Sequence, residues 1–256
     1  MANDPMNLTE LVRQVRERLA LEASLGVTDL ILPKPPPEPA VLPWPATQNA
    51  PRPPAPQRPA APLSPEAQKK AEALSVLEKE AAKCKRCGLC DSRTHLVFGV
   101  GNPDARLMFV GEAPGADEDR LGEPFVGRAG QLLTRIITQG MKMQRADVYI
   151  ANILKCRPPG NRPPAATEMV LCKEHLLKQI DIIRPATIVA LGAVALNGLT
   201  DGNYSISRAR GQFLLWRGLK LMPTFHPAYL LRNPSAKREV WEDIKKVLDA
   251  LKELSL

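Results

Sequence analysis

The alternation of apolar and polar positions after residue 64 predicts strands and helices in turn. Four short apolar runs have the length of strands, and segments with helical spacing follow them. The runs cover residues 105–111, 147–154, 186–192 and 219–226, and the helical segments cover 127–139, 167–183, 192–199 and 235–254. Near-continuous apolar strands that alternate with helices are typical of a parallel sheet covered on both faces. The pattern therefore predicts an α/β fold, in which ligands bind beyond the carboxyl ends of the strands.

The N-terminal quarter of the chain has a different pattern. Apolar residues at helical spacing in 7–26 predict a short amphipathic helix. Residues 33–65 then hold 14 of the 26 prolines, too many for regular backbone hydrogen bonding. We expect three parts, namely a tail at 1–32, an extended or disordered linker at 33–63 and a folded domain at 64–256. The tail helix would bind a protein partner or serve as a solubilising arm.

Charge and composition narrow the partners. The net charge is +8 and the sequence pI is about 9.4, which suits a polyanion such as nucleic acid or an acidic membrane, or simply a solvated basic surface. No apolar stretch approaches the roughly 18 residues that span a membrane. The first residues carry acidic side chains and lack an apolar signal core. We expect a cytoplasmic protein without a membrane segment.

Five cysteines suggest a metal centre, because clustered thiols in the cytoplasm more often bind metal than form disulfides. Cys84 and Cys87 form a Cys-x-x-Cys turn, whereas fifteen residues separate Cys156 from Cys172. A zinc ribbon repeats the short spacing twice, so the wide second pair favours an iron–sulfur cluster. The spacing leaves open whether Cys84 with Cys87 or Cys87 with Cys90 forms the first ligand pair.

Two further stretches carry candidate chemistry. Residues 111–127 are rich in glycine and crowd carboxylates, Glu112 and Glu118 among them, and crowding and burial raise carboxylate pKa values in many catalytic sites. The alternative is an acidic surface turn that caps the next helix. In 226–234, His226 precedes an apolar finger with basic neighbours, which could wedge into a base stack or start a helix whose leucines pack inward.

These stretches together resemble the family 4 uracil-DNA glycosylases, the iron–sulfur branch of the uracil-DNA glycosylase superfamily. The matching motifs are CKRC at 84–87, GNPDARLMFVGEAPGADED at 101–119, GEPFVGRAGQLL at 122–133, NILKCRPPGNRPP at 152–164, Cys172, and HPAYLLRNP at 226–234. They stand in the family's order and the match covers about residues 78–254. Residues 1–63 lie outside it.

The resemblance implies a three-layer α/β/α sandwich with a central four-stranded parallel sheet. It implies an enzyme that flips uracil out of double- or single-stranded DNA and hydrolyses the N-glycosidic bond with water, not with a lysine Schiff base, leaving an abasic site. It also implies a monomer with a four-iron–four-sulfur (4Fe-4S) cluster. The cluster ligands would be Cys84, Cys87, Cys156 and Cys172, with Cys90 a bystander.

The resemblance also gives roles to residues that would hold the base. Phe125 would stack on the flipped uracil, and the amide of Asn152 would accept from N3–H and donate to O4. The backbone around Glu112 and Ala113 would contact the carbonyls. His226 would donate a hydrogen bond to O2, and Glu112 or Glu118 would stabilise the cationic sugar or orient water.

Other residues would meet the DNA strand. They are Asn102, Arg157 and Arg162 at phosphates, and the finger residues Tyr229, Leu230, Leu231 and Arg232 in the minor groove. Where the best-known uracil-DNA glycosylases carry a water-handling Asp and a Tyr, this chain has Ala113 and Gly115, so a glutamate must serve or water is held otherwise. A non-catalytic protein that binds uracil-containing or polymerase-associated DNA is the alternative. A covalent trap is disfavoured, because residues 155–164 contain no histidine.

Overall fold

The computed structural model describes residue 13 and residues 64–253. The predicted tail helix at 7–26 and the proline-rich linker at 33–63 lie outside the described residues, apart from Arg13. The folded domain begins with helix α2 (Pro65–Ala82). Ser64 caps it, since its hydroxyl oxygen accepts a hydrogen bond of 3.1 Å from the backbone N–H of Ala67.

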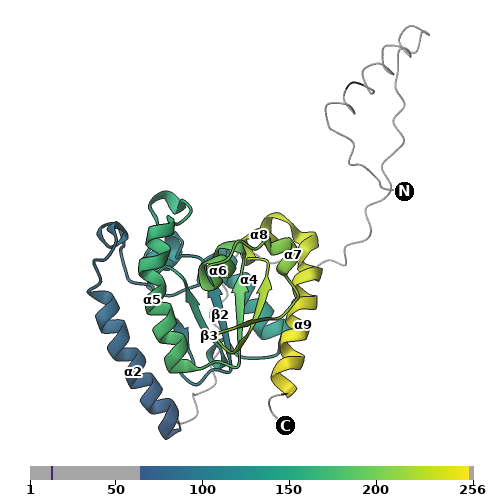
Figure 1. Cartoon of the computed structure of the whole chain (residues 1–256), viewed down its shortest axis with the longest axis horizontal. Coiled ribbons are helices and arrows are strands. Elements are labelled where there is room, and N and C mark those ends of the chain that lie inside the picture. Colours follow the sequence, from purple (N-terminus) through teal and green to yellow (C-terminus); the bar gives the residue numbers. More distant parts are fainter. Residues whose placement is uncertain (1–12, 14–63, 254–256) are drawn as a thin grey trace, which may run out of the picture. The chain divides into compact units, whose positions relative to one another are not determined.

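A six-stranded sheet forms the centre of the domain, in the order β1–β3–β2–β4–β6–β5 (Figure 1). The strands are β1 (Val100–Gly101), β2 (Leu107–Gly111), β3 (Tyr149–Asn152), β4 (Thr187–Leu191), β5 (Leu214–Trp216) and β6 (Leu219–Thr224). The four inner strands are parallel, which confirms the predicted four-stranded parallel sheet. The short strands β1 and β5 add antiparallel edges that the sequence did not reveal.

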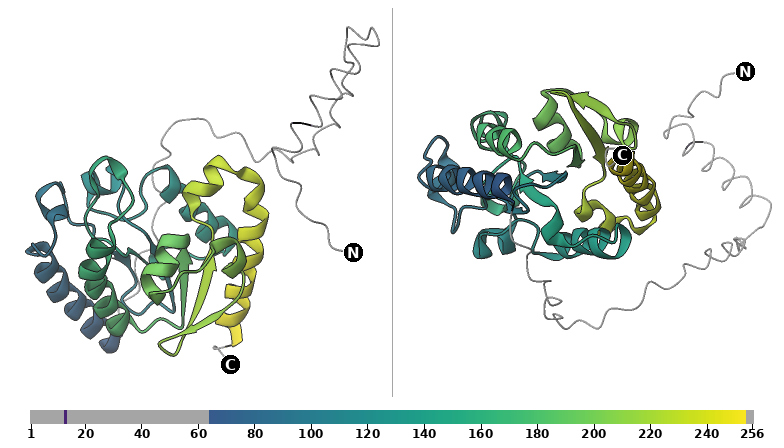
Figure 2. Two further views of the ribbon diagram at one scale, coloured as in Figure 1. Left: turned by 45° about the horizontal axis from the view of Figure 1, so that its top comes forward. Right: turned by 90° about the horizontal axis from the view of Figure 1, so that it is seen from below.

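Helices cover both faces of the sheet, so the predicted three-layer sandwich is confirmed. Met108 and Val110 of β2 pack under α2, α5 (Ala166–Ile183) and α6 (Ala193–Thr200). Leu107 and Phe109 face the other way, toward α4 (Arg128–Arg135), the π-helical turn η2 (Ile136–Gly140) and α9 (Lys237–Glu253). Figures 1 and 2 show α2 and α5 on one side of the sheet and α9 on the other. Burial of each such side chain contributes about 1.5–3 kcal/mol.

Several short elements lie in the loops between these layers. They are α3 (Ala116–Leu121), α7 (Ile206–Ala209) and α8 (Pro227–Arg232), with 3-10 turns η1 (Gly88–Asp91), η3 (Arg145–Asp147), η4 (Pro159–Asn161) and η5 (Pro234–Ala236). Because the inner strands are parallel, the loops after β2, β3, β4 and β6 meet at one edge of the sheet. Within the described residues, no helix is both long and apolar enough to cross a membrane.

Candidate functional site

Side chains from three sequence regions converge at the carboxyl edge of the sheet. Gly111 ends β2 directly beside Asn152, which ends β3. β6 ends at Thr224, and His226 follows two residues later as the N-cap of α8. Phe125 comes from the loop between α3 and α4, and its ring centroid lies 5.6 Å from that of His226. The parallel sheet thus brings together three residues that the sequence proposed for one site.

Gly111 lets two of these side chains meet above the end of β2. A Cβ atom at this position would lie 2.4 Å from Oδ1 of Asn152 and 2.5 Å from Cζ of Phe125. Neither distance is compatible with van der Waals contact, so only glycine fits. The amide oxygen of Asn152 and the edge of the Phe125 ring therefore both lie close to the Cα of Gly111.

Phe125 itself is held in a left-handed backbone conformation, with φ of 55°. Helix α4 packs so closely against it that a Cβ on Gly130 would lie 1.9 Å from the Phe125 carbonyl carbon. The guanidinium of Arg145 donates a hydrogen bond of 2.6 Å to the carbonyl of Pro124. Sequence reasoning missed Gly130 and Arg145, because their roles depend on contacts between distant segments.

Asn152 presents a buried hydrogen-bond acceptor to the site. Its side chain is 2% exposed, and within the described residues Oδ1 has no hydrogen-bond partner. Buried side-chain oxygens are nearly always paired, because an unpaired one costs about 1–3 kcal/mol. An acceptor left open at the end of a parallel strand is suited to an N–H donor of a bound molecule.

The hydrogen bonds of His226 define its protonation. Nδ1 accepts a hydrogen bond of 3.1 Å from the backbone N–H of Ala228, so we place the ring proton on Nε2. Burial, assisted by the charge of Arg232, lowers the pKa of the imidazole to about 4. His226 is therefore a neutral ring at pH 7 whose Nε2–H is a donor.

A buried ion pair between Arg210 and Asp243 contacts the end of β6. Asp243 is 1% exposed, and it accepts hydrogen bonds from the Thr224 hydroxyl at 2.6 Å and from Arg210 at 2.5 and 3.1 Å. The Arg210 guanidinium also lies over the ring of Phe225, 5.5 Å from its centroid. This network flanks His226 and was not apparent in the sequence, because Arg210 and Asp243 are 33 residues apart.

The two candidate carboxylates have different surroundings. Glu112 is partly buried, and this burial raises the pKa of its carboxyl group. Glu118 instead accepts three backbone hydrogen bonds, from Val126 at 3.0 Å, Gly127 at 2.9 Å and Gly115 at 3.1 Å. Both its oxygens are engaged in holding the loops on either side of α3. The expectation that Glu118 handles water is not supported by the structure, and Glu112 is the remaining candidate.

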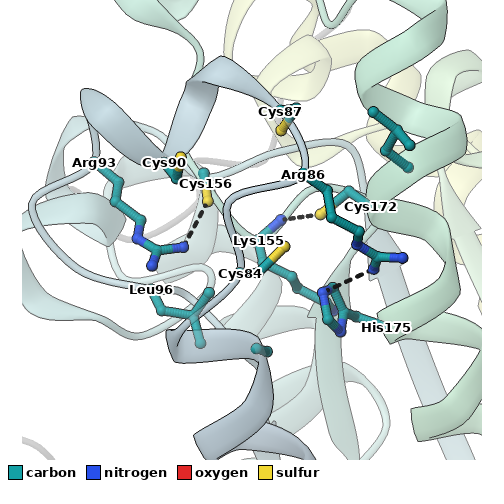
Figure 3. Close-up of a pocket in the computed structure, with 12 residues that line it drawn as sticks. Cys84, Arg86, Cys87, Cys90, Arg93, Leu96, Lys155, Cys156, Cys172 and His175 are labelled. Carbon is teal, nitrogen blue, oxygen red and sulfur yellow. Dashed lines mark hydrogen bonds between the residues drawn. The ribbon is translucent and has the colours of Figure 1, made fainter.

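All five cysteines line a single cavity beside this site, where the loop after α2 meets β3 and α5 (Figure 3). Within the described residues, no three Cys, His, Asp or Glu side chains are close enough to hold one metal ion. The donor set nevertheless fits a thiolate-bound cluster. Arg93 donates to Sγ of Cys156 at 3.3 Å, and the backbone N–H of Lys155 donates to Sγ of Cys172 at 3.2 Å. Arg86, Arg93 and Lys155 supply positive charge around the thiols.

The finger after His226 is a short helix rather than an extended loop. Leu230 is 1% exposed and packs into the core, which corrects the expectation that it enters DNA. Tyr229 and Leu231 are 38% and 37% exposed. Tyr229 stacks on Phe225, with ring centroids 4.8 Å apart. Arg232 is exposed at the end of the helix. Of the apolar finger residues, only Tyr229 and Leu231 are therefore exposed enough to enter a base stack.

The three residues that were predicted to contact phosphates have different surroundings. Asn102 follows β1, which runs antiparallel to β3, and its N–H bonds to the carbonyl of Val148 before β3 begins. It therefore lies near the start of β3, whereas Asn152 ends that strand, and its contact with a phosphate stays a prediction. Arg162 forms a two-pronged ion pair with Glu168, at 2.9 and 2.5 Å. Arg157 bonds to Oδ1 of Asn161 at 2.7 Å.

A groove of about 210 Å³ opens beside His226, lined by residues of α6, α7 and α8. Its lining residues are Gly192, Ala193, Ile206, Ser207, Phe225, His226 and Tyr229. The groove and the Phe125–Asn152 corner both contact His226. An extended ligand could therefore lie in the groove while one flat ring enters the corner.

Comparisons with known proteins agree with this geometry. The family model described as the uracil DNA glycosylase superfamily matches residues 98–245. A Type-4 uracil-DNA glycosylase of Thermotoga maritima is 48% identical over 187 residues, which is 72% of this chain and 97% of the relative. Proteins with the same description from Saccharolobus solfataricus and Archaeoglobus fulgidus are each 42% identical, over 70% and 69% of this chain and 86% and 92% of their own lengths.

The site joins an aromatic ring, an amide and an imidazole at the carboxyl ends of parallel strands in an α/β protein. The chain belongs to the uracil-DNA glycosylase superfamily. The matched segment contains Phe125, Asn152 and His226, and the relatives named above are all of Type 4.

Proposed function

We propose that this protein is a monofunctional uracil-DNA glycosylase, which hydrolyses the N-glycosidic bond of uracil in DNA and leaves an abasic site. The observation that carries the proposal is the open acceptor of Asn152, which approaches Gly111 together with Phe125, whose ring in turn lies 5.6 Å from the neutral imidazole of His226. The descriptions of the Type-4 relatives support it.

Base selection follows from the hydrogen-bonding pattern of Asn152. Oδ1 accepts from N3–H of uracil and the amide N–H donates to O4, while the ring lies against Phe125. Cytosine offers an acceptor at N3 and a donor at the exocyclic position, so both contacts would be mismatched. Each buried polar group left unpaired costs about 1–3 kcal/mol, which discriminates against the normal DNA base.

Bond cleavage leaves negative charge on the uracil and positive charge on the sugar. The Nε2–H of His226 donates to O2 as this charge develops, and a neutral donor keeps its proton while doing so. One such preorganised donor contributes roughly 3–4 kcal/mol to transition-state stabilisation. The carboxylate of Glu112 would stabilise the cationic sugar and orient the attacking water.

A base within a duplex must leave the stack before these groups can reach it. We propose that Leu231 and Tyr229 fill the space that uracil vacates, since both are exposed beside His226. Arg232 follows them and is suited to a phosphate, as are Arg157 and Arg162 if the pairing of Arg162 with Glu168 is given up. The DNA strand would occupy the groove between α6 and α8.

We further propose that Cys84, Cys87, Cys156 and Cys172 hold a 4Fe-4S cluster. Glycosidic hydrolysis transfers no electrons, so the cluster would serve as a structural link between the loop after α2, the end of β3 and α5. Burial raises the pKa of Cys172 to about 11, and coordination is what would keep this sulfur deprotonated. Cys90 lines the same cavity and remains a bystander in this assignment.

The catalytic machinery is proposed to lie wholly within 64–256, with 1–32 as a tail and 33–63 as a linker. Removal of residues 1–63 should leave activity on short oligonucleotides unchanged. Loss of activity in the truncated protein would assign residues 1–63 a role in catalysis. We propose that the enzyme acts as a monomer in the cytoplasm, where its five free cysteines would stay reduced.

A cleavage assay tests the proposed function. Purified protein is incubated with oligonucleotides that carry one uracil, as G:U, A:U or single strand, and then with alkali, which breaks the strand at abasic sites. Strand breakage dependent on uracil is expected. Absence of breakage on all three substrates would reject the enzyme and leave the DNA-binding alternative, and a cross-linked band that survives denaturation would indicate a covalent trap.

A further inference from the structure

A fully buried lysine lies between the cysteine-lined cavity and the base-reading asparagine. Lys155 is 1% exposed and follows β3, next to Cys156 in sequence. Its backbone N–H donates to Sγ of Cys172 at 3.2 Å, and its side-chain Nζ donates to the backbone carbonyl of Asn152 at 2.9 Å. One residue thus contacts both sites, and Figure 3 shows its contact with Cys172.

The position of Nζ is fixed from its other side as well. Nζ donates a hydrogen bond of 2.6 Å to Oε1 of Gln179, which is 0% exposed. The amide nitrogen of Gln179 in turn donates to the carbonyl of Phe98 at 3.0 Å and to the Tyr149 hydroxyl at 3.1 Å. Gln179 is therefore held by α5, β3 and the segment before β1, and it cannot follow Lys155 if the lysine moves.

Stability alone does not explain a lysine at this place. Within the described residues, no carboxylate lies within 4.0 Å of Nζ, so its burial is not offset by an ion pair. Burying an amino group costs free energy, which the hydrogen bonds to two carbonyl oxygens and the nearby sulfur of Cys172 offset only in part. The polar contacts of Lys155 therefore call for a functional reason.

We propose that Lys155 is a positioning residue that couples the cysteine-held metal centre to base recognition by Asn152. The hydrogen bond from Nζ to Asn152 closes residues 152–155 into a ring, and the backbone N–H of Lys155 ties this ring to Cys172. A displacement of Cys156 or Cys172 would shift the ring and with it the amide of Asn152. This inference rests on the proposed function.

Thermodynamic reciprocity gives a direct test of the coupling. If cluster binding favours the uracil-reading position of Asn152, then by linkage bound uracil favours the cluster-bound protein and should slow the loss of the cluster to a chelator. The purified full-length holoprotein is exposed to an iron chelator, with and without saturating free uracil. Loss of cluster is followed by absorbance at about 400 nm, where iron–sulfur proteins absorb. This readout does not depend on catalytic turnover.

Free uracil is expected to slow cluster loss in the wild-type protein by at least about fivefold, at the lower end of typical coupling. In Lys155→Met, iron per chain at the start should equal that of the wild type, while uracil should no longer slow its loss. The same variant should bind free uracil about tenfold more weakly, because Asn152 loses a fixed position. Its affinity for abasic-site DNA, which lacks the base, should stay unchanged.

Lys70→Met is the matched control. Lys70 is also largely buried and donates to a backbone carbonyl, that of Ile183, but it lies on α2 and pairs with Asp104. It should retain the wild-type response to uracil. If Lys155→Met does not load iron, Gln179→Met carries the test, because it removes the second acceptor of Nζ and leaves every cysteine contact in place. The expected protection by uracil in that variant is less than half that of the wild type.

Two results would overturn the proposal. Uracil could fail to slow cluster loss in the wild type, or it could slow it equally in the wild type and in the iron-loaded variant. Failure of the proposed function looks different, because the wild-type protein would then release no uracil from DNA.

Discussion

The ring of Phe125 lies 5.6 Å from the imidazole of His226, centroid to centroid, and is inclined to it by 35°. Neither residue is close to the other in sequence, and each ends a different loop at the carboxyl edge of the sheet. Asn152 reaches the same corner across Gly111. A planar base that enters there meets an aromatic surface, an amide and a neutral N–H donor together.

Gly111→Ala should abolish this arrangement without disturbing the rest of the fold. Its Cβ would overlap Oδ1 of Asn152 and the ring of Phe125, and both side chains would have to move. We expect the rate of uracil release to fall by at least about a hundredfold, comparable to the loss of one preorganised donor. In the control Gly88→Ala, the new Cβ meets no atom within 4 Å, and the rate should stay within about twofold of wild type. Near-normal uracil release by Gly111→Ala would contradict the proposed base-binding role of Asn152 and Phe125.

His226 should remain neutral well below pH 7. Its pKa is lowered from 6.5 to about 4 by burial, so between these values the unfolded chain binds a proton that the folded chain does not. The contribution of the neutral ring to stability is therefore complete above pH 6.5 and is lost as the pH falls toward 4. Nitrogen-15 NMR of the imidazole should show the Nε2–H form at pH 6. A doubly protonated ring at that pH would refute the assigned role.

Glu112 and Glu118 should respond differently to the same substitution. Glu118→Gln puts an NH₂ group against backbone N–H donors, leaving at least one of them unpaired at a cost of about 1–3 kcal/mol. We expect the Tm to fall by roughly 2–10 °C. Glu112→Gln should lower kcat without lowering the Tm, because burial already disfavours its charge. Asp117→Asn, on the exposed side of α3, is the control for both.

Acid should inactivate the enzyme through Glu112. Its pKa is raised above the ordinary value of 4.5, so kcat should decline as the pH falls through that raised value, before His226 becomes charged. If Glu118→Gln reproduces the kinetics of Glu112→Gln with an unchanged Tm, then the assignment of the catalytic carboxylate is wrong.

Substitutions of the two adjacent leucines in α8 should have different effects, one on activity toward duplex DNA and the other on stability. Leu231 is exposed, so Leu231→Ala should reduce uracil release from duplex DNA several-fold more than from single-stranded DNA, where no stack needs filling. Leu230 is in the core, and Leu230→Ala should cost about 2–5 kcal/mol of unfolding free energy, read from urea denaturation. If Leu231→Ala reduces uracil release equally from duplex and single-stranded DNA, then Leu231 does not fill the base stack.

The apolar pattern predicted the four inner strands because each is a nearly continuous apolar run, and the major helices because each buries an apolar face at helical spacing. It did not predict β1 or β5, since two or three residues at a sheet edge carry no detectable period. The finger was ambiguous for a related reason: helical spacing over six residues does not show that Leu230 points inward and Leu231 outward.

The chemistry of the site was partly visible in the sequence. Asn152 ends β3 and His226 lies two residues after β6, and the motifs of the family that the chain resembles gave both residues a role. The place of Asn102, near the start of β3 and away from Asn152, could not be predicted, because the direction of β1 is set by pairing with β3 and not by its own residues. The parts played by Glu118 and Lys155 follow from hydrogen bonds between distant segments, which no local pattern encodes.

The central claim is that Asn152 and His226 together read and release uracil. It is tested most directly by the single-turnover rate of free-uracil release from a G:U oligonucleotide, measured for the iron-loaded wild type, Asn152→Asp and His226→Ala. The wild type should release uracil, and each variant should be slower by about a hundredfold or more with an unchanged Tm. Asn197→Asp changes an amide whose hydrogen bonds, among residues 64–253, are with the backbone of Tyr204, and this control should match the wild type. Release by both site variants at wild-type rates, or none by the wild type, would contradict the account.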